Sequence, residues 1–208
     1  MANKRQFGFT LIEIIITMAI SGGLAVIALM GFSSMRAQTQ FSDAVERLRE
    51  STVQRRTEAN SSVQLTNGDT VGTIAFGRIM TFTPGSGVVK IETLITDSSE
   101  SPIPGQAVTS TGSNAFDYNI AWGVVFNKGL GDAPGLKRQV AFIRSPRDGS
   151  LHTAVSPAGG WVLNSGSYRY DDFITSTVPV GVGLQVSDGT RTATINIDPA
   201  TNGVGRSF

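Results

Sequence analysis

The sequence predicts an α+β protein, in which a long N-terminal helix runs from a transmembrane into an amphipathic segment and precedes a mainly antiparallel β domain. Residues 9–32 form an apolar run with a single charge, Glu13, and residues 33–59 continue without a proline. After residue 60, short apolar segments alternate with turn-forming residues, as is typical of strands. We therefore expect a leader (1–8), a transmembrane helix (9–32), an amphipathic extension (33–60) and a β-rich globular domain (61–208).

The composition excludes several classes of protein. The chain of 208 residues has 40% hydrophobic residues and 24 glycines, which suits one folded domain with tight turns. It has no cysteine, so disulfides and thiolate metal sites are excluded. A net charge of +1 gives no overall reason to expect nucleic acid as a partner.

The apolar run has the length of a membrane span. Its 24 residues would extend about 36 Å as a helix, against about 30 Å for the hydrocarbon core of a bilayer. Lys4 and Arg5 before it favour an N-terminus inside the cell and an exported C-terminal domain. The alternatives are a secretory signal peptide, for which the run is too long and lacks a cleavage site, and a plain membrane anchor.

A plain anchor does not explain Glu13. A carboxylate in a membrane segment costs about 2.5–3.5 kcal/mol on insertion scales and is usually functional and paired. Cleavage after Gly8 would give Phe9 a new α-ammonium, four residues before Glu13 and on the same helical face. The pair could form within one subunit or between staggered subunits, where a slipped subunit would leave the charge unpaired.

Residues 8–13, Gly-Phe-Thr-Leu-Ile-Glu, follow a short basic leader and begin the apolar run. This arrangement resembles the cleavage and methylation motif of type IV prepilins and type II secretion pseudopilins. The resemblance implies a pilin-like fold, cleavage between Gly8 and Phe9 by a prepilin peptidase, N-methylation of Phe9, and Glu13 as the glutamate used in assembly. A long helix followed directly by strands resembles minor pilins of the GspH/FimT type.

One departure from the family concerns the helix itself. Many pilins have a proline near the end of the apolar run, and here Gly22 and Gly23 are the expected weak point. Small residues four apart, such as Ala19 and Gly23, permit close helix contact. The amphipathic extension is either continuous with the membrane helix or separated from it by a break near residues 31–34. Its apolar stripe consists of Phe41, Ala44, Val45, Leu48 and Thr52, and its end is expected at Asn60.

The globular domain is predicted from turn-bounded apolar runs. Residues 96–114 are expected to form a long loop, and Phe116–Asn127 a central strand. A hairpin with an Asp188-Gly189 turn is expected to close the domain. The remaining strands are expected at Ser62–Thr66, Val71–Phe76, Arg78–Thr83, Val88–Ile95 and Gln139–Arg144.

No catalytic or metal-binding motif is recognisable, so we expect no enzyme activity and no cofactor. The single histidine, His152, has no cysteine or ligand-spaced carboxylates to complete a metal site. Asp171 and Asp172 are adjacent and would point to opposite faces of a strand.

A basic stretch is the alternative functional feature. Residues 137–147 contain four cations and Phe142 but no acid, which is compatible with phosphate contact and base stacking. Arg206 near the C-terminus resembles the beginning of a basic motif of DNA-binding minor pilins, but the second arginine is missing. The candidate DNA contacts are Lys137, Arg138, Arg144, Arg147 and Arg206.

We therefore expect a structural subunit of a pilus or pseudopilus, a single-pass cytoplasmic membrane protein that becomes extracytoplasmic in a filament. Its expected partners are prepilin peptidase, other pilin or pseudopilin subunits, and membrane lipids. The alternatives are a filament-displayed module that binds DNA or surfaces, and, ranked last, a membrane-anchored enzyme.

Overall fold

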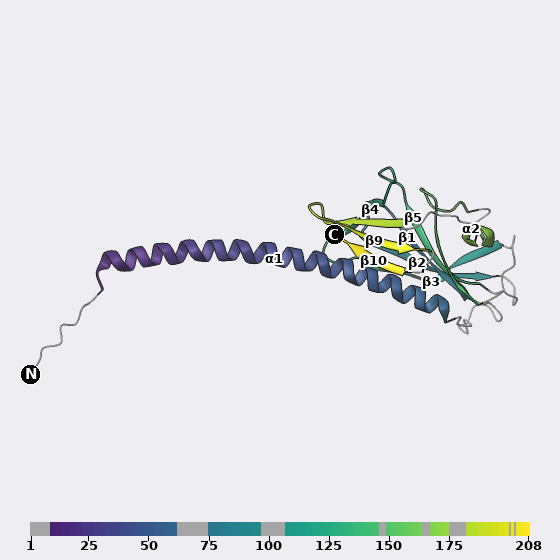
Figure 1. The fold of residues 1–208 in the computed structure, drawn as a ribbon, viewed down its shortest axis with the longest axis horizontal. Coiled ribbons are helices and arrows are strands. Elements are labelled where there is room, and N and C mark those ends of the chain that lie inside the picture. Colours follow the sequence, from purple (N-terminus) through teal and green to yellow (C-terminus); the bar gives the residue numbers. More distant parts are fainter. Residues whose placement is uncertain are drawn as a thin grey trace, which may run out of the picture. The chain divides into compact units, whose positions relative to one another are not determined.

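The computed structural model describes residues 9–61, 75–96, 107–145, 149–163, 167–174, 182–199, 201 and 203–208. Helix α1, Leu11–Asn60, precedes two antiparallel sheets, which confirms the predicted α+β fold class (Figure 1). The chain forms two compact units, Met1–Gln40 and Phe41–Phe208.

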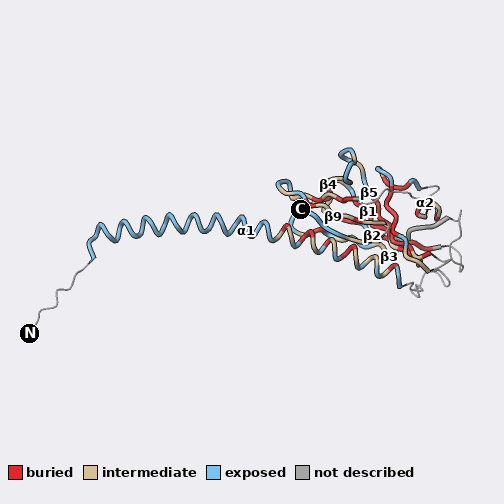
Figure 2. The backbone as a smooth tube through the Cα atoms, in the orientation of Figure 1, coloured by how far each residue is buried: buried red, intermediate tan, exposed pale blue. Residues whose placement is uncertain are grey.

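The first unit contains the apolar part of α1. The helix begins at Leu11, two residues later than predicted, and it has no break at Gly22, Gly23 or Gly31. Every residue from Phe9 to Thr39 is exposed, as the pale blue part of the tube in Figure 2 shows. This part of the helix is long and apolar enough to cross a membrane, with a mean hydropathy of 2.3 in its most apolar window.

In the second unit, α1 packs one face into a core. Burial begins at Phe41, and α1 ends at Asn60 as predicted. The hydroxyl of Thr52 donates to the Leu48 carbonyl at 2.8 Å, which satisfies the one polar group of the stripe. The predicted stripe is confirmed, since its members are all buried: Phe41, Ala44, Val45, Leu48 and Thr52.

The larger sheet has six strands in the order β6-β5-β1-β2-β3-β7. Its strands are β1 Ala75–Phe82, β2 Val88–Thr96, β3 Ala107–Asn119, β5 Arg138–Arg144, β6 Leu151–Val155 and β7 Tyr168–Arg169. Both faces are buried, which explains the unbroken apolar run in β5. Met80 and Phe142 belong to the core that includes α1, whereas Ile79 and Ile143 join a second core with Trp161.

The smaller sheet has the order β10-β9-β8-β4. Its strands are β4 Val125–Gly129, β8 Val182–Ser187, β9 Thr192–Asp198 and β10 Gly203–Ser207. The β8–β9 hairpin confirms the predicted pairing around Asp188-Gly189, but it does not close the domain, because β10 follows and pairs with β9. A short helix, α2 Tyr170–Ile174, completes the elements in the described residues.

Two predictions about the domain were wrong. The expected loop at 96–114 is a strand from Ala107 onward, because backbone pairing with β2 outweighs its polar composition. The expected central strand Phe116–Asn127 is interrupted by a turn, in which Trp122 and Gly123 have φ of 63° and 70°.

The other strand predictions had mixed outcomes. Strand β1 is one continuous strand where two had been expected, at Val71–Phe76 and Arg78–Thr83. Strands β2 and β5 confirm the predictions for Val88–Ile95 and Gln139–Arg144. The predicted strand Ser62–Thr66 lies outside the described residues.

Candidate functional site

Thr10 caps the N-terminus of α1. The backbone N–H of Glu13 lies 3.1 Å from the Thr10 carbonyl and 3.4 Å from the Thr10 hydroxyl oxygen. A Thr followed three residues later by Glu is the capping-box spacing, and an acid in the first turn also opposes the helix dipole. Sequence reasoning missed this role of Thr10, although the Thr-x-x-Glu spacing was visible.

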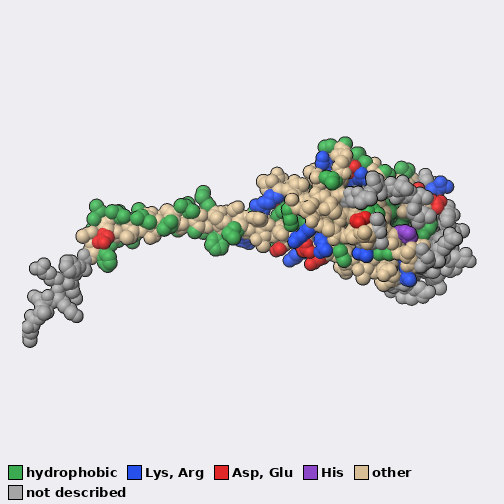
Figure 3. Space-filling model, in the orientation of Figure 1, with side chains coloured by type: hydrophobic (Ala, Val, Ile, Leu, Met, Phe, Trp, Pro, Cys, Tyr) green, Lys and Arg blue, Asp and Glu red, His purple; other side chains and the backbone are tan. Residues whose placement is uncertain are grey.

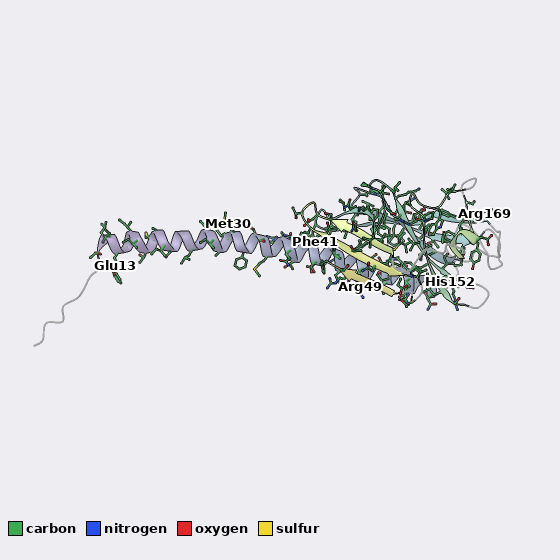
Figure 4. All side chains as sticks on the ribbon, turned by 45° about the horizontal axis from the view of Figure 1, so that its top comes forward. Glu13, Met30, Phe41, Arg49, His152 and Arg169 are labelled. Carbon is green, nitrogen blue, oxygen red and sulfur yellow. The ribbon has the colours of Figure 1, made fainter. Side chains whose placement is uncertain are left out.

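Glu13 stands among exposed apolar side chains. Leu11, Ile12 and Ile16 are 76%, 67% and 52% exposed, and in the described residues Glu13 forms no ion pair. Figure 4 shows Glu13 at the start of α1, and Figure 3 shows hydrophobic side chains covering this part of the helix. A charge in such surroundings needs a partner once the helix leaves water.

Phe9 precedes the helix in this uncut chain. It is 81% exposed and lies outside α1, and this structure does not test whether Phe9 and Glu13 share a helical face after cleavage. Gly8 lies outside the described residues. The arrangement of a cleaved N-terminus stays a prediction.

Two hydroxyls in the exposed part of α1 are bonded within the helix itself. The hydroxyls of Thr17 and Ser33 each donate to a backbone carbonyl three residues earlier, both at 2.9 Å. A Cβ added at Gly22 or Gly23 would meet nothing within 4 Å, so the surface there is open to a neighbour. Glu13 is therefore the one carboxylate that this segment presents.

The predicted DNA contacts are largely engaged within the protein. Arg138 forms an ion pair with Asp132 and donates to the carbonyl of Ser156. The guanidinium of Arg144 donates to the Asn60 carbonyl at 3.2 Å. Arg206 forms an ion pair with Glu46 at 2.9 Å. These cations serve internal contacts rather than a shared phosphate-binding face.

The other members of the basic stretch do not change this conclusion. Phe142 is fully buried, so this ring does not provide the base stacking with which the sequence was compatible. Lys137 is exposed, and Arg147 lies outside the described residues.

His152 and the Asp171–Asp172 pair, which the sequence did not favour as catalytic or metal-binding residues, have ordinary surroundings. His152 is exposed on β6, where its Nε2 lies 2.8 Å from the Ser150 hydroxyl. Asp171 and Asp172 form the first turn of α2, so their placement on a strand was wrong. Within the described ranges, no group of three or more metal-ligating side chains is found.

The comparisons with known proteins concern the N-terminal segment. Residues 3–32 match the family model of the prokaryotic N-terminal methylation motif. The match spans most of the leader, including Lys4 and Arg5, and continues through the Gly8–Phe9 junction and Glu13 to the end of the apolar run. No curated protein and no solved structure matches the chain.

Proposed function

We propose that this type IV prepilin- or pseudopilin-type protein is a structural subunit, a minor pilin or pseudopilin, of a type IV pilus or a type II secretion-like filament. Prepilin peptidase cleaves it between Gly8 and Phe9, and Phe9 is N-methylated. The observation that carries the proposal is the methylation motif, which joins a cleavage junction to an apolar helix with one carboxylate.

The exposed apolar helix explains how such a subunit assembles. The large apolar side chains between Leu11 and Met35 are exposed, and their contact with water is unfavourable unless lipid or other apolar helices cover them. Before assembly the helix spans the cytoplasmic membrane once, with Lys4 and Arg5 on the inside. In the filament, neighbouring helices of other subunits replace the lipid.

Glu13 selects the axial register in this proposal. After cleavage, the Phe9 ammonium of one subunit meets the Glu13 carboxylate of another as the helices come together. A subunit in the wrong register leaves a charge without a partner in apolar surroundings, which is strongly unfavourable.

Mass spectrometry of the native N-terminus tests the processing step. We expect a chain that begins at N-methylated Phe9 in filament fractions. An intact Met1 terminus in assembled filaments would refute the proposal.

Substitutions at Glu13 test the assembly step and separate it from helix capping. Glu13→Ala removes both the charge and the capping-box side chain, whereas Glu13→Gln keeps a capping side chain and removes only the charge. We expect both variants to insert into the membrane and both to be depleted from filaments. Normal incorporation of Glu13→Gln would show that the charge has no role in assembly.

A further inference from the structure

The second unit has a groove between α1 and the end of β3, and its volume is about 330 Å³. Arg47, Glu50, Ser51 and Arg55 line it from the helix, and Tyr118 and Asn119 line it from β3. This volume is at the lower end of the range for small-molecule sites, roughly 300–1,000 Å³. The groove is therefore large enough for a small ligand or one segment of a longer one.

Two polar groups in the groove are buried without a partner. Ser51 is 7% exposed, and its hydroxyl oxygen makes no hydrogen bond to any residue that the structure describes. The Nε of Arg55 is also buried and unbonded, while the rest of that guanidinium binds Glu58 and lies 4.6 Å from the Phe116 ring centre. A buried polar group without a partner is unfavourable, so a ligand or an ordered water that bonds either group would stabilise the site.

The rim of the groove adds further unused groups. Neither Arg47 nor Glu50 forms an ion pair in the described part of the chain. Burial raises the pKa of the Tyr118 hydroxyl above its usual value, with opposing effects from Arg47 and Glu50, which shows that both charges lie near it. The phenol is therefore neutral at physiological pH and offers both a donor and an acceptor.

The turn after β3 provides an independent observation. Trp122 follows Ala121, which lines the groove, and it is 55% exposed with a φ of 63°. A bulky residue in the left-handed region is strained, and such strain is often found at ligand-binding sites. The turn therefore exposes a large aromatic ring one residue along the chain from the groove lining, and a ligand that extends beyond Ala121 could pack an apolar face on it.

The charges around the groove decide the class of ligand. Glu58 lies beside the groove and pairs with both Arg55 and Arg78, whereas Glu50 on the groove lining forms no ion pair in the described residues, so an anion would meet a free carboxylate. The arginines only donate, the carboxylates only accept, and Ser51 and Tyr118 do both. Hydroxyl groups match this mixture, because each of them donates and accepts.

We propose that this groove binds a neutral saccharide unit, whose hydroxyls bond Ser51, Arg47 and Tyr118 while Trp122 packs on the sugar ring. The site belongs to the globular unit and does not depend on Glu13 or on leader cleavage. A failure of saccharide binding would therefore leave the proposed filament role untouched.

The test uses the full chain in phosphatidylcholine nanodiscs, because glycoside detergents would compete for the site. We expect binding on an array of neutral glycans, followed by calorimetric titration of each bound oligosaccharide. Tyr118→Phe and Arg47→Ala should each weaken binding about 2- to 10-fold, as expected for one lost hydrogen bond. Trp122→Ala should weaken it by about tenfold, the equivalent of one aromatic contact.

Arg169→Ala is the matched control, because this exposed arginine pairs through its backbone with Ala107 at the other end of β3. It should leave the affinity unchanged within about twofold. Binding to no neutral glycan, or binding that survives all three groove variants, would overturn the proposal. The proposal would also be overturned if the protein bound acidic glycans or inorganic phosphate selectively and the Glu50→Gln variant bound them more tightly. That result would identify an anion site.

Discussion

Replacing Arg138 with Gln tests whether this cation is a structural residue or part of a DNA-binding face. The side chains of Arg138 and Asp132 are only 12% and 6% exposed. Nε and Nη2 of Arg138 each contact one carboxylate oxygen of Asp132, and Nη1 donates to the Ser156 carbonyl. The substitution would therefore leave the buried carboxylate of Asp132 without its counter-charge.

The expected destabilisation follows from this burial. Removing one partner of a buried ion pair costs about 3–5 kcal/mol. For a domain of this size each kcal/mol lowers Tm by about 2–4 °C, so the expected decrease is about 6–20 °C. Lys137→Gln is the matched control, since Lys137 is exposed and a surface substitution changes stability by about 0.5 kcal/mol or less.

The assay is thermal unfolding of the full chain in nanodiscs, followed by near-ultraviolet circular dichroism, which reports packing of the globular unit. A double variant, Arg138→Met with Asp132→Leu, should recover most of the stability, because it removes both charges together. If Arg138→Gln unfolds within 2 °C of the unmodified protein, then the ion pair does not stabilise the fold. Loss of DNA retention in a destabilised Arg138 variant would report unfolding and not a lost phosphate contact.

Three further predictions concern the same unit. Leu48→Ala should lower the free energy of unfolding, measured by chemical denaturation, by about 2–5 kcal/mol, because Leu48 is fully buried where α1 packs on the sheets. A decrease below about 1 kcal/mol would contradict this packing. Asp188→Ala should lower the free energy of unfolding by about 1 kcal/mol, since hydrogen bonds from the Thr190 backbone and its neighbours lower the pKa of Asp188. This contribution is present above pH 3.8 and is lost as the pH falls through the lower pKa of the folded state. Equal acid denaturation curves for the variant and the unmodified protein would refute it. Burial raises the pKa of Tyr168 above 10.0, with a smaller opposing effect from its hydrogen bond with Gln139. Its stabilising contribution is therefore present below pH 10.0 and lost as the pH rises through the pKa of the folded state, so Tyr168→Phe should lose less stability at alkaline pH. An unchanged dependence of unfolding on alkaline pH would contradict this prediction.

The helix was predictable because its signals are local. The apolar run requires no partner within the chain, and the 3.6-residue spacing from Phe41 to Thr52 identifies the buried face directly. The N-terminal motif is likewise a contiguous segment, which is why Gly8, Phe9 and Glu13 could be proposed from the sequence. The cap at Thr10 is equally local, since the Thr-x-x-Glu spacing identifies it, although that spacing was not recognised in the sequence.

The errors in the β domain have a different cause, because they depend on contacts between distant residues. The run around Trp122 is apolar enough for a central strand, but Ile120 and Val124 reach the core from either side of a turn. Periodicity cannot distinguish that turn from a strand. The groove was invisible for the same reason, since Ser51 and Tyr118 are far apart in the sequence and ordinary by themselves.

The C-terminal strand shows how a motif can be misread when its partner is distant. Arg206 pairs with Glu46 of α1, and Phe208 lies edge-on to Phe41 with ring centres 6.4 Å apart. Arg49 donates to the Val204 carbonyl at 3.1 Å, so β10 is joined to the helix at three points. In the sequence these residues are more than 150 positions from their partners, and Arg206 alone resembled the beginning of a basic motif of DNA-binding minor pilins. The contacts instead make β10 the strand that joins the smaller sheet to α1, which accounts for an arginine at this position without a nucleic-acid partner.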